Sequence, residues 1–328
     1  MTGIEVALPF WLDRPDVEAM DVALAASDTG FDAVWIGEMA TYDAFALATA
    51  VGLRAPGMTL KIGPLAVGVR SPVALALGAS SVASLTGSRV DIALGASSPA
   101  IVTGWHDRRW AHHVPVMRET IECLRSILTG ARVEYVGQHV SSHGFRLRTA
   151  QPDTRIALGA FGPGMIRVSA QHADEVVLNL ASPARLAEIR AAIDAAAAVA
   201  GRAAPRLTVW VPAALNPGAA ARAQLAAQLA VYLSPPGYGE MFSALGFDDL
   251  VRRARTGATR RDLARAVPVE LLDHVCALGS ADRIATRLRA YREAGADCVA
   301  VVPSTAEDPG GRATLRAATA AISSNREM

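Results

Sequence analysis

The sequence RVDIALGASSP, residues 89–99, decides the fold class of this chain. Residues 90–95 form a mostly apolar run that ends abruptly in glycine, serine and proline. The stretches GPLAVGVRSP (63–72) and RIALGAFGPG (155–164) likewise pass from an apolar run to glycine, serine or proline. A buried strand, a Gly/Ser/Pro loop and then a helix is the arrangement with which α/β proteins build phosphate or cofactor sites. Three such units predict one site that is assembled from several strand ends.

Eight strands are predicted from short runs rich in valine, isoleucine and leucine. These runs lack the alternation of a half-exposed strand, which is typical of parallel strands buried on both faces. They cover residues 4–8, 33–37, 60–68, 90–95, 155–160, 175–180, 207–213 and 298–303.

Helical patterns alternate with these runs, notably over residues 15–27, 117–128, 183–200 and 281–294. Eight strands that alternate with helices predict a closed (β/α)8 TIM barrel, as one domain over residues 1–328. An open doubly wound sheet is the alternative. The first strand is followed by LPFWLDRP, whereas that alternative favours GxGxxG at this point.

Two insertions interrupt the alternation, after strands four and seven. Residues 133–148 predict a β-hairpin, with turns at Gly137 and around residues 141–144. Residues 216–280 are too long for one helix and contain SPPGYG (234–239), so we expect a helical insertion there.

Composition excludes several classes of protein and partner. The net charge of +1 argues against a nucleic-acid surface or a basic membrane patch. No window is apolar enough for a membrane span, and the N-terminal residues lack the pattern of a signal peptide. The three cysteines lie far apart, which predicts reduced thiols in a cytoplasmic protein rather than disulfides or a metal site.

Two predicted helices, residues 44–53 and 72–85, contain no charged residue. An outer helix of a barrel normally shows a polar face to water, whereas a helix that is apolar all round is buried on both sides. We therefore expect these neighbouring helices to form a homodimer interface.

Four segments together resemble the bacterial luciferase-like monooxygenase superfamily. They are TGFDAVWIGE (29–38), residues 70–99, MRETIECLRSILTG (117–130) and GAFGPGMIRVSAQHADEVVLNL (159–180). More narrowly, they resemble its branch that uses the deazaflavin coenzyme F420. The resemblance implies a cofactor ring across the C-terminal mouth of the barrel. It also implies that Phe161, Gly162, Pro163 and Gly164 hold the cofactor phosphate, which agrees with the positive end of a helix that begins there.

Further site residues follow from the resemblance. Gly68 and Val69 match the pair that carries a non-proline cis peptide bond behind the ring, although an ordinary turn with a serine cap is the alternative. Glu38-Met39 stands where the F420 branch often has Asp-His. Ser98, in the loop Ala96-Ser97-Ser98, stands where some relatives have a proton-donating glutamate. Both departures weaken any assignment of sugar-phosphate or alcohol oxidation.

Hydride transfer also needs a group that donates or accepts a proton. Glu38 and His106 are the candidate catalytic residues for this step. His112 and His113 are further candidates. No metal site is expected, because His139 and His143 lie in a glycine-containing hairpin. Aromatic residues at or near strand ends are expected to contact an apolar substrate: Phe10, Trp11, Trp105 and Trp210.

The sequence therefore favours an F420-dependent oxidoreductase that moves a hydride to or from a small organic substrate. Two alternatives stay open. One is a two-component monooxygenase that uses reduced FMN and oxygen. The other is a barrel that binds a flavin or deazaflavin without turnover.

Overall fold

A computed structural model describes residues 3–11 and 14–323 of the chain. It divides into two compact units. Unit 1 comprises Met1–Phe31, Leu178–Arg190 and Thr208–Met328, and unit 2 comprises Asp32–Val177 and Ala191–Leu207. Each unit contains its own run of neighbouring parallel strands.

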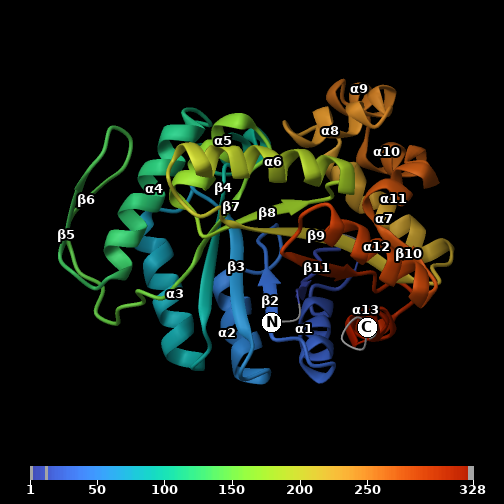
Figure 1. Cartoon of the computed structure of the whole chain (residues 1–328), viewed down its shortest axis with the longest axis horizontal. Coiled ribbons are helices and arrows are strands. Elements are labelled where there is room, and N and C mark those ends of the chain that lie inside the picture. The colour runs from blue at the N-terminus through green and yellow to red at the C-terminus, as the bar shows by residue number, and fades with distance from the viewer. Residues whose placement is uncertain (1–2, 12–13, 324–328) are drawn as a thin grey trace. The chain divides into compact units, whose positions relative to one another are not determined.

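Unit 2 is built on four parallel strands in the order β2-β3-β4-β7, and the first residues of β8 pair with β7. Every connection between β2, β3, β4, β7 and β8 contains a helix, as Figure 1 shows in blue to green. The strands are β2 (Ala33–Ile36), β3 (Thr59–Ala66), β4 (Val90–Gly95), β7 (Ile156–Gly159) and β8 (Glu175–Asn179); the helices are α2 (Ala44–Arg54), α3 (Pro72–Thr86), α4 (His113–Leu128) and α5 (Pro163–His172).

Unit 1 has parallel strands in the order β10-β9-β11-β1. Their bounds are β1 (Ile4–Ala7), β9 (Arg206–Leu215), β10 (Ala277–Gly279) and β11 (Cys298–Pro303). Its remaining elements are α1 (Glu18–Asp28), α7 (Ala219–Tyr232), α8 (Tyr238–Ala244), α9 (Asp248–Arg255), α10 (Arg260–Ala266), α11 (Val269–Val275), α12 (Ala281–Glu293), η2 (Pro309–Gly311) and α13 (Arg312–Ser323), while α6 (Pro183–Val199) has residues in both units.

The fold is α/β with a closed, eight-stranded parallel barrel, so the predicted (β/α)8 class is confirmed. The eight predicted strands are β1, β2, β3, β4, β7, β8, β9 and β11. The sheet has a ninth strand, β10, which pairs with the end of β9. It lies inside the expected helical insertion and has only three residues, too few for a sequence pattern.

The hairpin after α4 consists of β5 (Val133–Val136) and β6 (Ser141–Phe145), which pair antiparallel. The predicted turn at Gly137 is present, since its N–H donates to the Val140 carbonyl at 2.9 Å. The prediction of a turn around residues 141–144 is wrong, because these residues belong to β6. Gly144 has a φ of 70° beside a shift in register, so a bulge explains this glycine.

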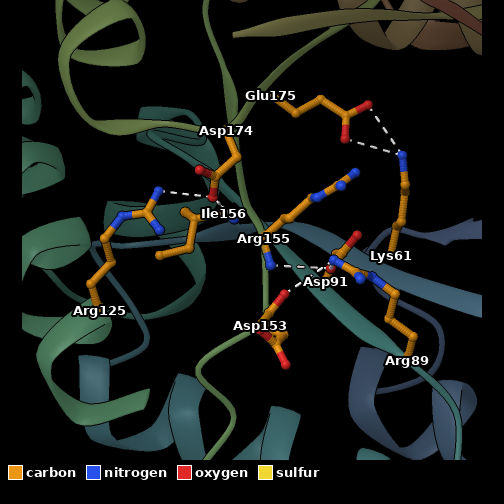
Figure 2. A network of polar contacts seen from close by, with 9 residues as sticks. All are labelled: Lys61, Arg89, Asp91, Arg125, Asp153, Arg155, Ile156, Asp174 and Glu175. Carbon is orange, nitrogen blue, oxygen red and sulfur yellow. Dashed lines mark hydrogen bonds and ion pairs between the residues drawn. The ribbon is translucent and has the colours of Figure 1, made fainter. Parts of the chain in front are cut away.

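The N-terminal strand ends in unit 2 carry a network of charged groups, which Figure 2 shows. Lys61 Nζ lies 3.1 Å from both carboxylate oxygens of Glu175, and both side chains are buried. Asp91 accepts the Arg155 N–H at 3.1 Å, and Asp174 accepts the Ile156 N–H at 2.8 Å. Buried charges need such partners, and polar groups at the N-terminal end of a barrel contribute to stability rather than to catalysis.

Helices α2 and α3 pack against each other and present apolar side chains to solvent. Leu53, Leu77 and Leu85 are 62%, 47% and 64% exposed. The expected homodimer interface at this face stays a prediction. Among the described residues, none of the helices combines the length and apolarity that a membrane crossing requires.

Candidate active site

Glu38 follows β2 by two residues and belongs to a charged cluster with Arg70 and Asp43. Arg70 donates from Nε to Glu38 Oε2 at 3.3 Å, and its Nη2 contacts both Glu38 and Asp43. The Ala44 N–H at the start of α2 donates to Glu38 Oε1 at 3.2 Å. The Glu38 carboxylate is therefore fixed in orientation by an arginine and a helix N-terminus.

Asp43 caps α2 by accepting the N–H groups of Phe45 and Ala46 at 3.0 and 3.1 Å. Partial burial opposes its ionisation, but the hydrogen bonds from Arg70 and these N–H groups hold the pKa of Asp43 below its usual value. Arg70 was not identified from the sequence. The signal was present, because an arginine directly before a Ser-Pro helix start lies at a strand end.

Gly68 and Val69 do not form the expected cis peptide bond. Among the described residues, the cis bond joins Gly63 and Pro64 within β3, where the register with β4 shifts. The bond between Gly68 and Val69 lies in an ordinary turn, in which the N–H groups of Val69 and Arg70 both donate to the Ala66 carbonyl. Ser71 then caps α3 by accepting the Ala74 N–H at 3.2 Å. The alternative, a turn with a serine cap, is what the structure shows.

The loop after β4 carries Ala96, Ser97 and Ser98 into η1 (Ala100–Trp105), a π-helix. Ser97 has a φ of 63°, in the left-handed region that non-glycine residues seldom adopt. The Trp110 indole N–H donates to the Ala96 carbonyl at 3.2 Å, which ties the far end of the loop to the strand. Gly68 lies against this loop, because a Cβ on it would be 3.1 Å from Val102.

The N-terminus of α5 has no side-chain cap. Its N-cap is Gly162, and Pro163 has no N–H, so the N–H groups of Gly164 and Met165 are the first that can bind an anion. Nothing lies within 4 Å of a Cβ built on Gly162, so this side of the loop is open. Phe161 is half-buried directly before the cap. These features fit a phosphate group.

The N-terminus of α4 lies beside that of α5, since a Cβ on Gly164 would be 2.8 Å from Val114. Burial, together with the neighbouring His112, lowers the pKa of His113. The imidazole of His113 also lies 3.8 Å from the Trp110 ring, measured between centroids. A neutral His113 is therefore expected at neutral pH.

The remaining predicted residues lie at strand ends or in loops. In unit 2, Trp105 is 57% exposed and His106 follows it, exposed, at the end of η1. In unit 1, Phe10 is half-buried, Trp11 is buried and Trp210 is a half-buried residue of β9. Unit 2 thus brings Glu38, Gly68, Val69 and the loop after β4 together around one group of strand ends, while Phe10, Trp11 and Trp210 belong to unit 1.

The described part of the chain shows neither a cluster of metal-ligating side chains nor an exposed cysteine thiol. No group of three or more His, Cys, Asp or Glu side chains there could hold a metal ion. The three cysteines are buried. Burial raises the pKa of Cys123 to about 11, which leaves it a thiol at neutral pH.

The sequence pattern of the luciferase-like monooxygenase family matches residues 15–298, so the chain belongs to this family. A protein of Mycobacterium tuberculosis, Rv3520c, is 25% identical over 337 residues, which cover 94% of this chain and 97% of that protein. It is provisionally named a coenzyme F420-dependent oxidoreductase.

Two solved structures show the same fold. The F420-dependent tetrahydromethanopterin reductase of Methanopyrus kandleri has a TM-score of 0.80 at 17% identity, covering 96% of this chain and 97% of its own. The oxygenating constituent of 3,6-diketocamphane monooxygenase from Pseudomonas putida, solved with FMN, has a TM-score of 0.70 at 16% identity, covering 97% of each chain. Proteins of this fold therefore include users of F420 and of FMN.

Proposed function

We propose that the protein is an F420-dependent oxidoreductase that transfers a hydride between the deazaflavin and a small organic substrate. The observation that carries this proposal is the uncapped N-terminus of α5 at Gly162, among the strand ends that also carry Glu38 and Ser97. The name of the M. tuberculosis relative and the higher TM-score to the M. kandleri reductase support F420 over FMN.

Each part of the candidate site has a place in this function. The N–H groups of Gly164 and Met165 would hold the cofactor phosphate, because they have no side-chain cap and lie at the positive end of a helix. Ala96, Ser97 and Ser98 would border the ring together with Gly68 and Val69. When bound, the deazaflavin supplies the hydride chemistry, and the protein supplies orientation and a dry surface.

Glu38 and His106 are assigned to two further functions, positioning of the ring and proton transfer. The Glu38 carboxylate is held by Arg70 and the Ala44 N–H, so it suits a fixed hydrogen-bond acceptor at the ring edge. His106 is exposed on the loop after η1, where its imidazole can exchange a proton with solvent. We assign positioning to Glu38 and proton transfer to His106. Trp105, which lies in the same unit, is assigned to substrate contact, while Phe10, Trp11 and Trp210 of unit 1 stay predicted substrate residues.

Titration of the purified protein with both cofactors tests the proposal. We expect F420 to bind at micromolar concentration, followed by its absorbance, with much weaker binding of FMN. Micromolar binding of FMN without a response to F420 would instead favour the two-component monooxygenase, which the similarity to the FMN-bound structure supports. A bound reduced cofactor that no acceptor oxidises faster than in free solution would favour a barrel without turnover.

A further inference from the structure

The chain between η1 and α4 is tied to the loop after β4 by Trp110. Residues 103–109 are all exposed, and they include His106, the candidate for proton transfer. Trp110 is half-buried, and its indole N–H donates to the Ala96 carbonyl at 3.2 Å. The two residues are 14 positions apart in the sequence, so this hydrogen bond closes the whole exposed segment onto the end of β4.

The hydrogen bond acts directly on the strained residue of the β4 loop, the name used here for residues 96–98. The Ala96 carbonyl and the Ser97 N–H belong to one planar peptide unit, so the direction of this carbonyl is linked to φ of Ser97. Ser97 has a φ of 63°, and such a conformation persists in a non-glycine residue only where neighbouring groups maintain it. The donor that Trp110 supplies is therefore a restraint on this conformation.

The other carbonyls of the β4 loop and its approach are bound by backbone groups. The Gly95 carbonyl accepts the Val67 N–H at 3.1 Å, and the Ser98 carbonyl accepts the N–H groups of Ile101 and Val102 at 3.2 and 2.9 Å. The hydrogen bond to Ala96 differs because it comes from a side chain. A single substitution can therefore remove it without altering the backbone.

The indole ring of Trp110 packs against His113, the first residue of α4. The ring centroids lie 3.8 Å apart, with 43° between the ring planes. Burial and the neighbouring His112 lower the pKa of His113, so this contact is made by a neutral imidazole at neutral pH. The next residue, Val114, lies against Gly164 at the start of α5. The start of α4 therefore contacts both the Trp110 side chain and the predicted phosphate site.

The start of α4 is in turn fixed by the hairpin. His112, with a φ of 55°, stacks on His139 of the hairpin turn at 4.9 Å between centroids. The buried Glu119 carboxylate accepts the N–H groups of His139 and Val140 at 2.7 and 2.9 Å and lies 3.4 Å from Arg118. These contacts place the titratable and charged groups around His113 on both α4 and the hairpin. Two elements thus fix the surface against which Trp110 packs.

We propose that Trp110 is a positioning residue that packs against His113 and holds the β4 loop in the conformation that borders the cofactor ring. It also anchors the exposed segment that carries His106. The part that concerns the ring rests on the proposed function, which assigns the β4 loop to the cofactor. The hydrogen bond itself needs no cofactor, so the loop is expected to be preorganised in the free protein.

Trp110→Phe tests the hydrogen bond, because phenylalanine keeps a ring beside His113 but has no indole N–H. Hydrogen exchange is measured by mass spectrometry on the full-length chain without cofactor. We expect exchange of residues 97–106 to become about fivefold faster, the equivalent of one neutral hydrogen bond, and exchange within α4 to stay unchanged. Trp105→Phe removes an exposed indole from the same segment and is the matched control, which should exchange as the native chain does.

Tryptophan fluorescence tests the contact between Trp110 and His113. The emission of Trp110 is obtained as the difference between the native chain and Trp110→Phe. It should change as His113 gains a proton, with a midpoint below the usual histidine pKa. His113→Gln should abolish this titration, whereas His143→Gln, at an exposed position of the hairpin, should retain it. Emission that does not titrate in the native chain would overturn the contact.

Titration with F420 then tests the role of the loop in cofactor binding. Trp110→Phe should weaken binding about two- to fivefold, because its β4 loop spends more time in other conformations. Unchanged exchange in this variant would overturn the proposal, and so would faster exchange with unchanged affinity for F420. Faster exchange in the variant, together with a native chain that does not bind F420, would leave the restraint on the loop in place and overturn the proposed function.

Discussion

Replacement of Gly162 by aspartate should stabilise the protein and abolish cofactor binding together. Gly162 is the N-cap of α5, with φ −92° and ψ 158°, a conformation that suits aspartate. Nothing lies within 4 Å of its added Cβ, so the new side chain fits without rearrangement. Its carboxylate would then accept the N–H groups to which we assign the cofactor phosphate.

The Gly162→Asp substitution is expected to raise the stability of the protein and to lower its affinity for the cofactor, and the size of each effect can be worked out separately. A capping carboxylate in place of glycine contributes a few tenths of a kcal/mol as a cap and about 0.3–1 kcal/mol against the helix dipole. The sum raises the Tm by about 1–3 °C. Phosphate binding loses hydrogen bonds to a charged group of about 1.5–3 kcal/mol each, so losing two weakens Kd at least about 100-fold.

The assay combines a thermal scan of the free protein with a titration by F420. Gly162→Asn is the matched control, since it caps the helix without a charge and should weaken binding less than the aspartate does. Gly162→Ala should affect binding least, because the methyl group occupies open space. An aspartate variant that binds F420 as tightly as the native chain would refute the phosphate assignment at α5.

Three further perturbations test other parts of the structure. Glu175→Gln removes one carboxylate from a buried ion pair with Lys61 and should cost about 3–5 kcal/mol in urea unfolding. Asp249→Asn in an exposed pair should cost less than about 0.5 kcal/mol. Burial opposes ionisation of Glu119, but the N–H groups of the hairpin turn at residues 138–140 outweigh it and lower its pKa. The stability that ionised Glu119 contributes is therefore complete above the usual glutamate pKa and is lost as the pH falls through the lowered pKa. The Tm difference between the native and the Glu119→Gln protein should shrink as the pH is lowered. A Tm difference that does not change with pH would contradict this. Light scattering should give the mass of a dimer for the native chain and of a monomer for Leu77→Glu, and a monomeric native chain at micromolar concentration would rule out the predicted interface.

The strands and most helices were predictable because burial leaves a direct trace in composition. A parallel strand covered on both faces is mostly apolar, and the eight barrel strands are rich in valine, isoleucine, leucine and alanine, although β1, β3, β4 and β8 also carry Glu5, Lys61, Asp91 and Glu175. The start of α3 was predictable for a similar local reason, since Ser71-Pro72 is a standard cap and first turn. The three residues of β10 leave no such trace, because they pair within a helical region.

The partners of the site residues could not be read from the sequence. Arg70 lies 32 positions from Glu38, and only the geometry of two strand ends brings the groups together. The position of the bulge in β3 was missed for a related reason. Gly63 is needed because a Cβ there would be 2.2 Å from the Ala93 carbonyl of the neighbouring strand, a constraint that no local pattern records. Lys61 did leave a signal, since a lysine inside an apolar strand requires a buried partner.

The two ends of the strands differ in how completely their polar groups are satisfied. At the N-terminal ends in unit 2, Asp91 and Asp174 each accept a backbone N–H and pair with an arginine (Figure 2). At the C-terminal ends, three non-glycine residues adopt a positive φ within two residues of the end of a strand. They are Ser97 at 63°, Leu180 at 58° and Asn216 at 44°.

Such a conformation costs a buried leucine about 1–2 kcal/mol, and a fold that needed only stability would carry glycine there. The same ends hold the buried side-chain oxygen of Asn179, for which the described residues supply no hydrogen-bond partner, and the uncapped N-terminus of α5 at Gly162. Strain and unsatisfied polar groups gather where ligands bind, because a ligand completes them in the bound state. In each unit we therefore expect ligands at the C-terminal strand ends, while in unit 2 the charged network at the N-terminal ends contributes stability.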